Sequence, residues 1–531
     1  MTAPDTLTSV APSRGTSVPV HRMRRHSGTP WTCTFRKWLT FLGIAVICLW
    51  LAVLVLISSA VFRHMYLSAD YASYFQAWSL IGSGHLNPLD TVWLNHVPFV
   101  KNDFELVIWP LSVLHVVDPR GMILLLVQDI AIAATGLIVY KWIIEYLERT
   151  ETSPRVALGI AVGVLLVIVS NPGPYQTVLF DFHIEPISTV FIVAAGRSLW
   201  LGQGRRVWLW VALALLCGSF AAITLVGLGL SAVLAGRTTR RTGGLLMLTG
   251  VGWAGFIDLV GANVGSALQY YAYLAGRTSL PAGSGLLVVA GGIVTHPQRV
   301  ISQLHLRFPL IWTLVRPVGV VGLASAWGFG VPAVVLVVDA LNSHYIFIYE
   351  AYQNFAVFPF VLLGTVMVLV TIARRLRWTR VLVLGFGLVL LGSSLAYANA
   401  TSRQGIRWNI AQVGTAQATQ LGRALAMTPS SAEVVATLGV MGRFSGRRSV
   451  YFFFPHRTIP IESRTVIFVF DPPSEIGSPR VHPEDDIAAS DFVRNSLHGR
   501  VLVDNSGVTA FRWTPPPGTT RMTFPVTAKV G

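Results

Sequence analysis

Long apolar runs recur along the chain between residues 38 and 398. The first run, residues 38–62, is about 25 residues long. That length crosses a bilayer and exceeds the apolar core of a signal peptide. Further runs follow at residues 122–143, 156–169, 187–201, 245–261, 357–372 and 381–398. The pattern predicts an α-helical polytopic membrane protein.

Two other runs do not fit a single crossing. Residues 208–235 have arginines at both ends, so both ends are expected on the same side of the membrane. Two full crossings would need about 40 residues, more than this run contains. We therefore expect two short helices, broken near Gly218-Ser219, and a second broken pair at residues 310–341, turning near Trp327-Gly328. Such breaks line cavities rather than lipid. The total is about eleven crossings.

The pattern changes after residue 399. Short apolar runs of strand length, separated by Gly, Pro, Ser and Asp, follow a helical stretch at residues 411–427, and a second helical stretch covers residues 487–497. We expect a small α/β domain at residues 400–514 and a Pro-rich tail at 515–531. The membrane domain then covers residues 36–399, with outer loops at 63–120 and 263–309. Residues 1–35, rich in Thr, Ser, Pro and Arg, read as a disordered basic tail.

Composition and charge support this picture. The chain has 531 residues, of which 53% are hydrophobic and 12% charged, about half the charged fraction of a soluble domain. Its net charge of +16 comes from arginines that gather at the ends of apolar runs. This distribution marks cytoplasmic loops and argues against nucleic acid as a partner. It predicts a multi-pass plasma-membrane protein with a cytoplasmic N-terminus and an extracytoplasmic C-terminal domain. The three cysteines have no paired spacing, which argues against a disulfide framework or a zinc site.

A polar loop directly after the first span gathers four acids in a chain poor in charge: Asp70, Asp90, Asp103 and Glu105. Asp70 stands at the outer end of the span and precedes the aromatic stretch YASYFQAW. Three roles remain open for it: a general base for an acceptor hydroxyl, a metal ligand, or the N-cap of a helix.

A second acidic motif follows the third span. If residues 181–185 are extended, Asp181, His183 and Glu185 share one side of the chain. Such a set suits a divalent metal or an ion bridging a diphosphate, or else forms a solvated turn at the interface. Asp103 and Glu105 repeat the same spacing.

Other charged residues lie in or beside the apolar runs. Arg316, before Pro317, is placed either to meet a lipid phosphate or to extend along the helix into the headgroups. Asp129, Asp258 and Asp339 are also found here, with Asp129 the deepest.

Several segments, in this order, resemble a bacterial membrane family, domain of unknown function 2079. They are DYASYFQAWSLIGSG, NDFELVIWPLSVL, FDFHIEP, QYYAYLAG, HYIFIYEAYQNFAVFPFVLL and AEVVATLGVMGRFSGRRSVYFFFP. That family is similar to the C-superfamily (GT-C) glycosyltransferases, which take sugars from polyprenyl-phosphate donors. The resemblance implies a GT-C-like fold with Asp70 as the catalytic acid of the first outer loop. Asp181, His183 and Glu185 become a second acidic site near metal (Mg²⁺ or Mn²⁺) or donor phosphate.

The chain departs from the resemblance at one place. At the break of the short helical pair, an acidic Lys-Glu-Asp-like motif is expected, but this chain reads CGSFAAIT, with Gly218 and Ser219 and no charge. Two hypotheses follow. The first is a glycosyltransferase of a bacterial, actinobacterial, plasma membrane. It would build cell-envelope glycans from a polyprenyl-phosphate sugar, with Arg316 or a metal at Asp181 and Glu185 neutralising the phosphate. The second is an inactive scaffold or a lipid or polysaccharide transport protein with the same fold.

Overall fold

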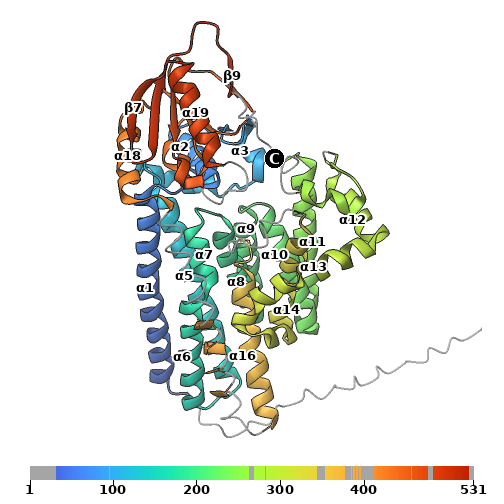
Figure 1. Ribbon diagram of the computed structural model, residues 1–531. Helices are drawn as coiled ribbons and strands as arrows, with labels where there is room; N and C mark the ends of the chain where they lie inside the picture. Colours follow the sequence, from blue (N-terminus) through green and yellow to red (C-terminus); the bar gives the residue numbers. More distant parts are fainter. Residues whose placement is uncertain are drawn as a thin grey trace, which may run out of the picture.

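The computed structural model describes residues 31–94, 96–261, 268–281, 283–343, 353–376, parts of 384–395, 412–455, 457–475 and 482–524. A bundle of helices carries a small domain at one of its ends, which we call the domain side (Figure 1). The first thirty residues of the predicted tail and most of the predicted span at 381–398 lie outside the described residues.

The membrane part is almost entirely helical. In chain order its elements are α1 (Cys33–His64), α2 (Ala69–Gly82), β1 (Leu89–Asp90), β2 (Val97–Pro98), α3 (Phe99–Asp103), α4 (Ile108–Ser112), η1 (Val113–Val116), α5 (Met122–Arg149), α6 (Pro154–Ser170), α7 (Pro172–Leu179), α8 (Glu185–Trp200), α9 (Gly204–Leu215), α10 (Ser219–Ala235), α11 (Arg237–Leu259), η2 (Leu268–Ala275), α12 (Gly285–Thr295), α13 (Pro297–Val315), η3 (Arg316–Val318), η4 (Val320–Ala324), α14 (Ala326–Leu341) and α16 (Val357–Leu376).

Five helical runs in the described part are long and apolar enough to cross a membrane: α1, α5, Pro154–Leu179, α11 and α16. Shorter apolar helices include α10, α12 and α14. The prediction of a polytopic helical membrane protein is therefore confirmed. A further helix, α7, lies between the predicted runs at 156–169 and 187–201, because Pro172 starts it and the side chain of Asn171 accepts a hydrogen bond from the backbone of Gly173.

Both predicted helix breaks are present. Gly218, with φ of 79°, separates α9 from α10, as expected. The second break lies at η3 and η4, ahead of the predicted Trp327-Gly328 turn, because Pro317 and Gly319 (φ 94°) interrupt the helix there first. The hydroxyl of Thr365 on α16 donates to the carbonyls of Val318 and Gly319 at 2.8 and 2.9 Å. It thereby satisfies backbone groups that the break leaves open.

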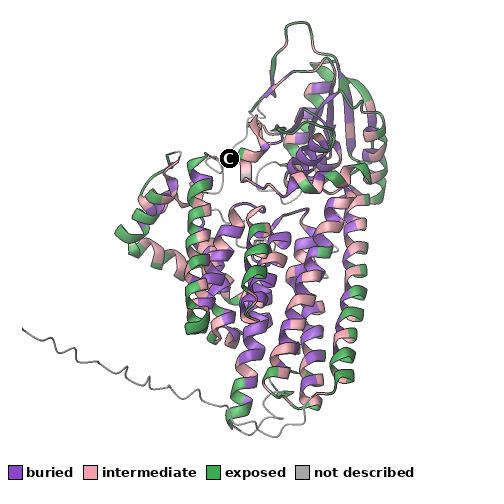
Figure 2. Ribbon diagram, turned by 180° about the vertical axis from the view of Figure 1, so that it is seen from behind, coloured by how far each residue is buried: buried purple, intermediate pink, exposed green. Residues whose placement is uncertain are grey.

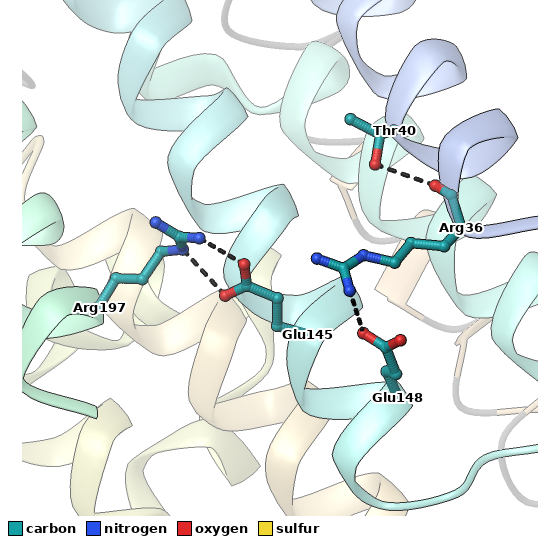
Figure 3. Close-up of polar contacts among 5 residues, drawn as sticks. All are labelled: Arg36, Thr40, Glu145, Glu148 and Arg197. Carbon is teal, nitrogen blue, oxygen red and sulfur yellow. Dashed lines mark hydrogen bonds and ion pairs between the residues drawn. The ribbon is translucent and has the colours of Figure 1, made fainter. Parts of the chain in front are cut away.

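At the end opposite the domain side, charged residues pair between helices. Arg197 of α8 forms a bidentate salt bridge with Glu145 of α5. The guanidinium of Arg36 on α1 lies 3.4 Å from the carboxylate of Glu148, which is also on α5 (Figure 3). Two-pronged arginine–carboxylate contacts are among the stronger polar contacts of proteins. These contacts connect α1, α5 and α8 at this end of the bundle.

The C-terminal domain contains α18 (Thr415–Ala426), η5 (Leu438–Phe444), η6 (Pro472–Glu475) and α19 (Pro483–Asn495). Its five-stranded sheet has the order β4-β3-β6-β8-β7. The strands are β3 (Glu433–Ala436), β4 (Val450–Phe452), β6 (Val466–Phe470), β7 (Arg500–Asn505) and β8 (Val508–Trp513). β3 pairs parallel with β4 and β6, and β8 pairs antiparallel with β6 and β7. Each of these strands coincides with a predicted apolar run.

Part of the Pro-rich end belongs to this domain. β9 (Arg521–Thr523) pairs antiparallel with β5 (Thr458–Pro460), and the backbone N–H of Ile461 donates to the carbonyl of Thr520. Phe524 is buried against the rings of Phe453 and Phe492. The chain between Pro515 and Phe524 is therefore part of the domain, and Phe524 contributes to its core.

The polar loop after α1 lies between the bundle and the domain. Gln76 of α2 donates to the backbone carbonyls of Arg447 and Arg448, each at 3.1 Å. Thr91 and Val450 exchange two hydrogen bonds at the edge of β4. The burial pattern shows this junction as continuous with the core of the domain (Figure 2). The sequence predicts the loop and the domain separately, and the fold makes them one unit.

Candidate functional site

Helix α2 holds Asp70 at the junction of bundle and domain. Ser68 is the N-cap of this helix, and Asp70 lies in its first turn. The capping role considered for Asp70 therefore belongs to Ser68, whose hydroxyl accepts from the backbone N–H of Asp70 at 3.4 Å. All residues of α2 are described, and only Asp70, Leu80 and Gly82 are not buried. The helix thus presents one acid at the edge of a buried surface.

Asp181 lies against the start of the same helix. Its carboxylate accepts from the backbone N–H of Ser68 at 2.9 Å and also from the Ser68 hydroxyl. Asp181 has a φ of 103°, in the left-handed region that side chains rarely adopt. The extended geometry expected for residues 181–185 is therefore absent at its first residue.

Asp90 is a further acid that the sequence does not single out as a site residue. It is 2% exposed, accepts from the backbone of Val92 at 3.0 Å, and accepts from the amide of Asn102 at 2.8 Å. The charge of Asp70 acts on both Asp90 and Asp181. We call these three residues the aspartate group. Only the fold brings them together, since they come from three separate segments.

Burial raises the pKa of two members of the aspartate group. Desolvation and, to a smaller extent, the nearby charge of Asp70 together raise the pKa of Asp181 to about 8 against the opposing hydrogen bonds from Ser68. Desolvation likewise raises the pKa of Asp90 to about 6. Asp70 is only half-buried, so burial penalises a charge there less than at Asp90 or Asp181. The group therefore favours one charged carboxylate beside two that hold protons more tightly.

The second acidic site predicted from the sequence divides in two. Glu185 starts α8 and lies within electrostatic reach of Cys217 and Asp339, whereas Asp181 faces Ser68. Glu105 also acts on Cys217 and accepts from the hydroxyl of Tyr74 at 3.1 Å. We call Glu105, Glu185 and Asp339 the glutamate group. It lies beside the break between α9 and α10, where the backbone of Val107 donates to Leu216 at 2.8 Å.

His183 lies on the segment that connects Asp181 to Glu185. Its ring stacks on Phe180, with centroids 5.4 Å apart, and meets the edge of Tyr74. Burial lowers the pKa of His183 to about 3, so the imidazole is neutral at physiological pH. Gln128 of α5 holds this segment from both sides: its amide donates to the Asp181 carbonyl, and its carbonyl oxygen accepts from the His183 N–H. The neighbouring Asp129 accepts from Ser58 of α1 at 3.0 Å.

Asp103 and Arg316 are the remaining predicted site residues. Asp103 ends α3, and its side chain lies outside the described residues. Arg316 is exposed at the break between α13 and α14. Among the described residues, no three His, Cys, Asp or Glu side chains lie close enough together to hold a metal ion. Asp181 and Glu185 have different neighbours, so these contacts do not make them a shared ligand set.

Comparison with known proteins gives one family and, among solved structures, distant similarities. The crystal structure of ArnT from Cupriavidus metallidurans bound to undecaprenyl phosphate is similar to this chain with 14% identity and a TM-score of 0.43, over 88% of this chain and 97% of that chain. The apo structure of ArnT gives 13% and 0.42 with the same coverage. No curated protein sequence matches. A model of predicted membrane proteins, DUF2079, matches residues 63–496, which include α2, both acid groups and the sheet up to α19. The chain therefore belongs to the DUF2079 family of predicted membrane proteins.

Proposed function

We propose that this protein is a membrane glycosyltransferase that uses a polyprenyl-phosphate-linked sugar to build cell-envelope glycans on the outer face of the plasma membrane. The observation that carries the proposal is the aspartate group. Asp70 is the half-buried member, and its two buried partners hold protons more tightly. A charged, reachable carboxylate is what a general base requires.

In the proposed reaction Asp70 accepts the proton of an acceptor hydroxyl. The acceptor oxygen forms a bond to the anomeric carbon of the donor sugar, the bond from that carbon to the phosphate oxygen breaks, and the polyprenyl phosphate leaves with the electron pair. Asp181 and its contacts with Ser68 keep the first turn of α2 in position. Asp181 is thus a positioning residue, and Asp70 is the proposed catalytic residue.

The donor phosphate requires a cationic partner. Arg316 is the proposed partner, because it is an exposed arginine at a break in the membrane helices. A lipid-linked substrate enters from the bilayer, and broken helices are where backbone and side chains line such an entry. Arg316→Gln tests this role separately from Asp70.

One observation favours a second candidate. The turn before α10 carries Gly218 and Ser219 and no charge of its own. A scaffold or a lipid or polysaccharide transport protein would keep the fold and the junction without needing chemistry at this break. The glutamate group beside the break supplies carboxylates from other segments, and this supports the enzyme.

A complementation experiment distinguishes the two. Cells that lack the protein receive the wild type, Asp70→Asn, Glu185→Gln or the control Asp491→Asn, an exposed residue of α19. Envelope glycan composition and the amount of protein in the membrane are then measured together. If the protein is the proposed glycosyltransferase, cells with Asp70→Asn should have altered envelope glycans at normal protein abundance. Unchanged glycans with both Asp70→Asn and Glu185→Gln would favour the scaffold or transport protein.

A further inference from the structure

A cleft between the first membrane helix and the C-terminal domain is unused by the proposed reaction. It has a volume of about 510 Å³ and is lined by Ala60, Arg63, His64, Thr415, Ala418 and Thr419. One wall is the last turn of α1, and the other is the first half of α18. It therefore lies where a transmembrane helix meets the domain that stands on it (Figure 1).

The length of α1 places the cleft at the level of lipid headgroups. The helix has 32 residues, so it is about 48 Å long, whereas the hydrocarbon core of a bilayer is about 30 Å thick. Arg36 and Lys37 stand at one end of its apolar run, and Arg63 and His64 stand at the other. Phe41, Leu49 and Leu56 are 68%, 71% and 66% exposed along its length, as lipid-facing side chains are. Ala60, between this surface and Arg63, leads from the lipid side into the cleft.

The polar groups of the cleft suit an anion. The Nε of Arg63 donates to the carbonyl of Ser59 at 3.1 Å, and this hydrogen bond holds the arginine side chain along the helix. The two terminal nitrogens of the guanidinium then remain for a ligand. The Nδ1 of His64 contacts the carbonyl of Val413 at 2.8 Å, so that nitrogen faces the protein backbone and not the cleft. Among the described residues no carboxylate lies within ion-pair distance of Arg63, and the first turn of α18 has no acidic residue.

We propose that this cleft binds the phosphate of an anionic phospholipid headgroup from the leaflet on the domain side. Arg63 provides the charge, and the hydroxyls of Thr415 and Thr419 provide further polar contacts. The acyl chains would lie along the exposed apolar face of α1. Such a lipid would hold the domain against the membrane helix at a point separate from the aspartate group. This inference does not depend on the proposed glycosyltransferase activity.

The test uses the full-length protein, purified in mild detergent and mixed with phosphatidylglycerol, phosphatidylcholine or inorganic phosphate. Native mass spectrometry measures the lipid retained by the wild type, by Arg63→Gln, by Thr419→Val and by the matched control Arg500→Gln, an exposed arginine of β7. Loss of a charged hydrogen bond predicts about tenfold weaker retention of phosphatidylglycerol by Arg63→Gln. Thr419→Val should weaken it less, and Arg500→Gln should match the wild type.

Three outcomes would overturn the proposal. Equal retention of phosphatidylglycerol by Arg63→Gln and the wild type would show that the cleft does not bind it. Equal retention of phosphatidylcholine and phosphatidylglycerol by the wild type would remove the selectivity for an anionic lipid. Displacement of the lipid by inorganic phosphate at similar concentration would identify a site for free anions. Size-exclusion profiles of all variants distinguish loss of binding from loss of folding. Thr419→Val provides a second variant of the cleft in case Arg63→Gln does not fold.

Discussion

Ser68 donates two hydrogen bonds to the carboxylate of Asp181, one from its backbone N–H at 2.9 Å and one from its hydroxyl. The two residues are 113 positions apart, and Asp70 follows two residues after Ser68. This contact fixes the first turn of α2 against the segment between α7 and α8. It connects the acid proposed for catalysis to the core of the bundle.

Removing the Ser68 hydroxyl should therefore weaken the fold at this point. Ser68→Ala deletes the N-cap and one hydrogen bond to a buried acid, and we expect the free energy of unfolding to fall by about 1–2 kcal/mol. Ser68→Thr keeps a hydroxyl and serves as the control. Thermal unfolding in detergent, followed by intrinsic fluorescence, measures both. Equal midpoints for Ser68→Ala and the wild type would contradict the role given to this contact.

The aspartate group should make stability depend on pH. Burial raises the pKa of Asp181 from 3.8 to about 8 and that of Asp90 to about 6. The folded chain then holds protons that the unfolded chain releases above about pH 4. The free energy of unfolding should fall as pH rises from about 4 to about 8, by up to roughly 1.4 kcal/mol per pH unit for each group still protonated. Asp90 contributes up to about pH 6, and Asp181 up to about pH 8.

Asp181→Asn isolates the part of this effect that Asp181 contributes. The amide has the shape of the protonated acid and cannot ionise, so the decline between about pH 6 and pH 8 should be shallower in the variant, and Glu433, whose pKa burial raises to about 7, accounts for part of what remains. Unfolding midpoints at pH 5 and pH 8 measure it. A decline at high pH that is as steep in Asp181→Asn as in the wild type would assign the titration to another group.

The docking of the domain on α2 depends on a close approach at Gly442. A Cβ atom at this position would lie 2.5 Å from the Cβ of Leu67 and 2.8 Å from the ring of Tyr71. Gly442→Val should therefore push the domain from α2 at a cost of about 1–3 kcal/mol and increase proteolysis at the junction. Gly422 on α18 has open space around its Cβ position, so Gly422→Ala is the matched control and should be neutral or stabilising. Proteolysis of Gly442→Val at the rate of the control would show that the domain does not rest on α2 in this way.

Much of the fold follows from hydrophobic pattern. The described spans, the two broken pairs and each strand of the five-stranded sheet coincide with runs that the sequence marks, because lipid and a buried sheet both demand continuous apolar segments. The position of the second break could not be read off, since Pro317 and Trp327-Gly328 are both plausible turning points in sequence. The contact of Thr365 with the break is a tertiary feature.

The site was predictable only in part. Asp70 is marked by its position after a span, and that position is local. Its association with Asp90 and Asp181 depends on how three segments pack, and Asp90 looks like any loop acid until the fold buries it. The prediction that Glu185 shares one side of the chain with Asp181 and His183 assumed an extended backbone. The left-handed φ of Asp181 prevents that conformation.

The role of Asp70 as the base is the central feature of the proposed reaction. The proposed reaction frees polyprenyl phosphate whatever sugar is transferred, so its release can be followed without knowing the sugar. Membranes containing equal amounts of the wild type, Asp70→Asn or Asp491→Asn are supplied with lipid-linked sugars extracted from the same cells, and released polyprenyl phosphate is measured by mass spectrometry over time. If Asp70 is the base, Asp70→Asn should slow release about a hundredfold or more, while Asp491→Asn should match the wild type. Release by Asp70→Asn at the wild-type rate would contradict the role of Asp70 as the base.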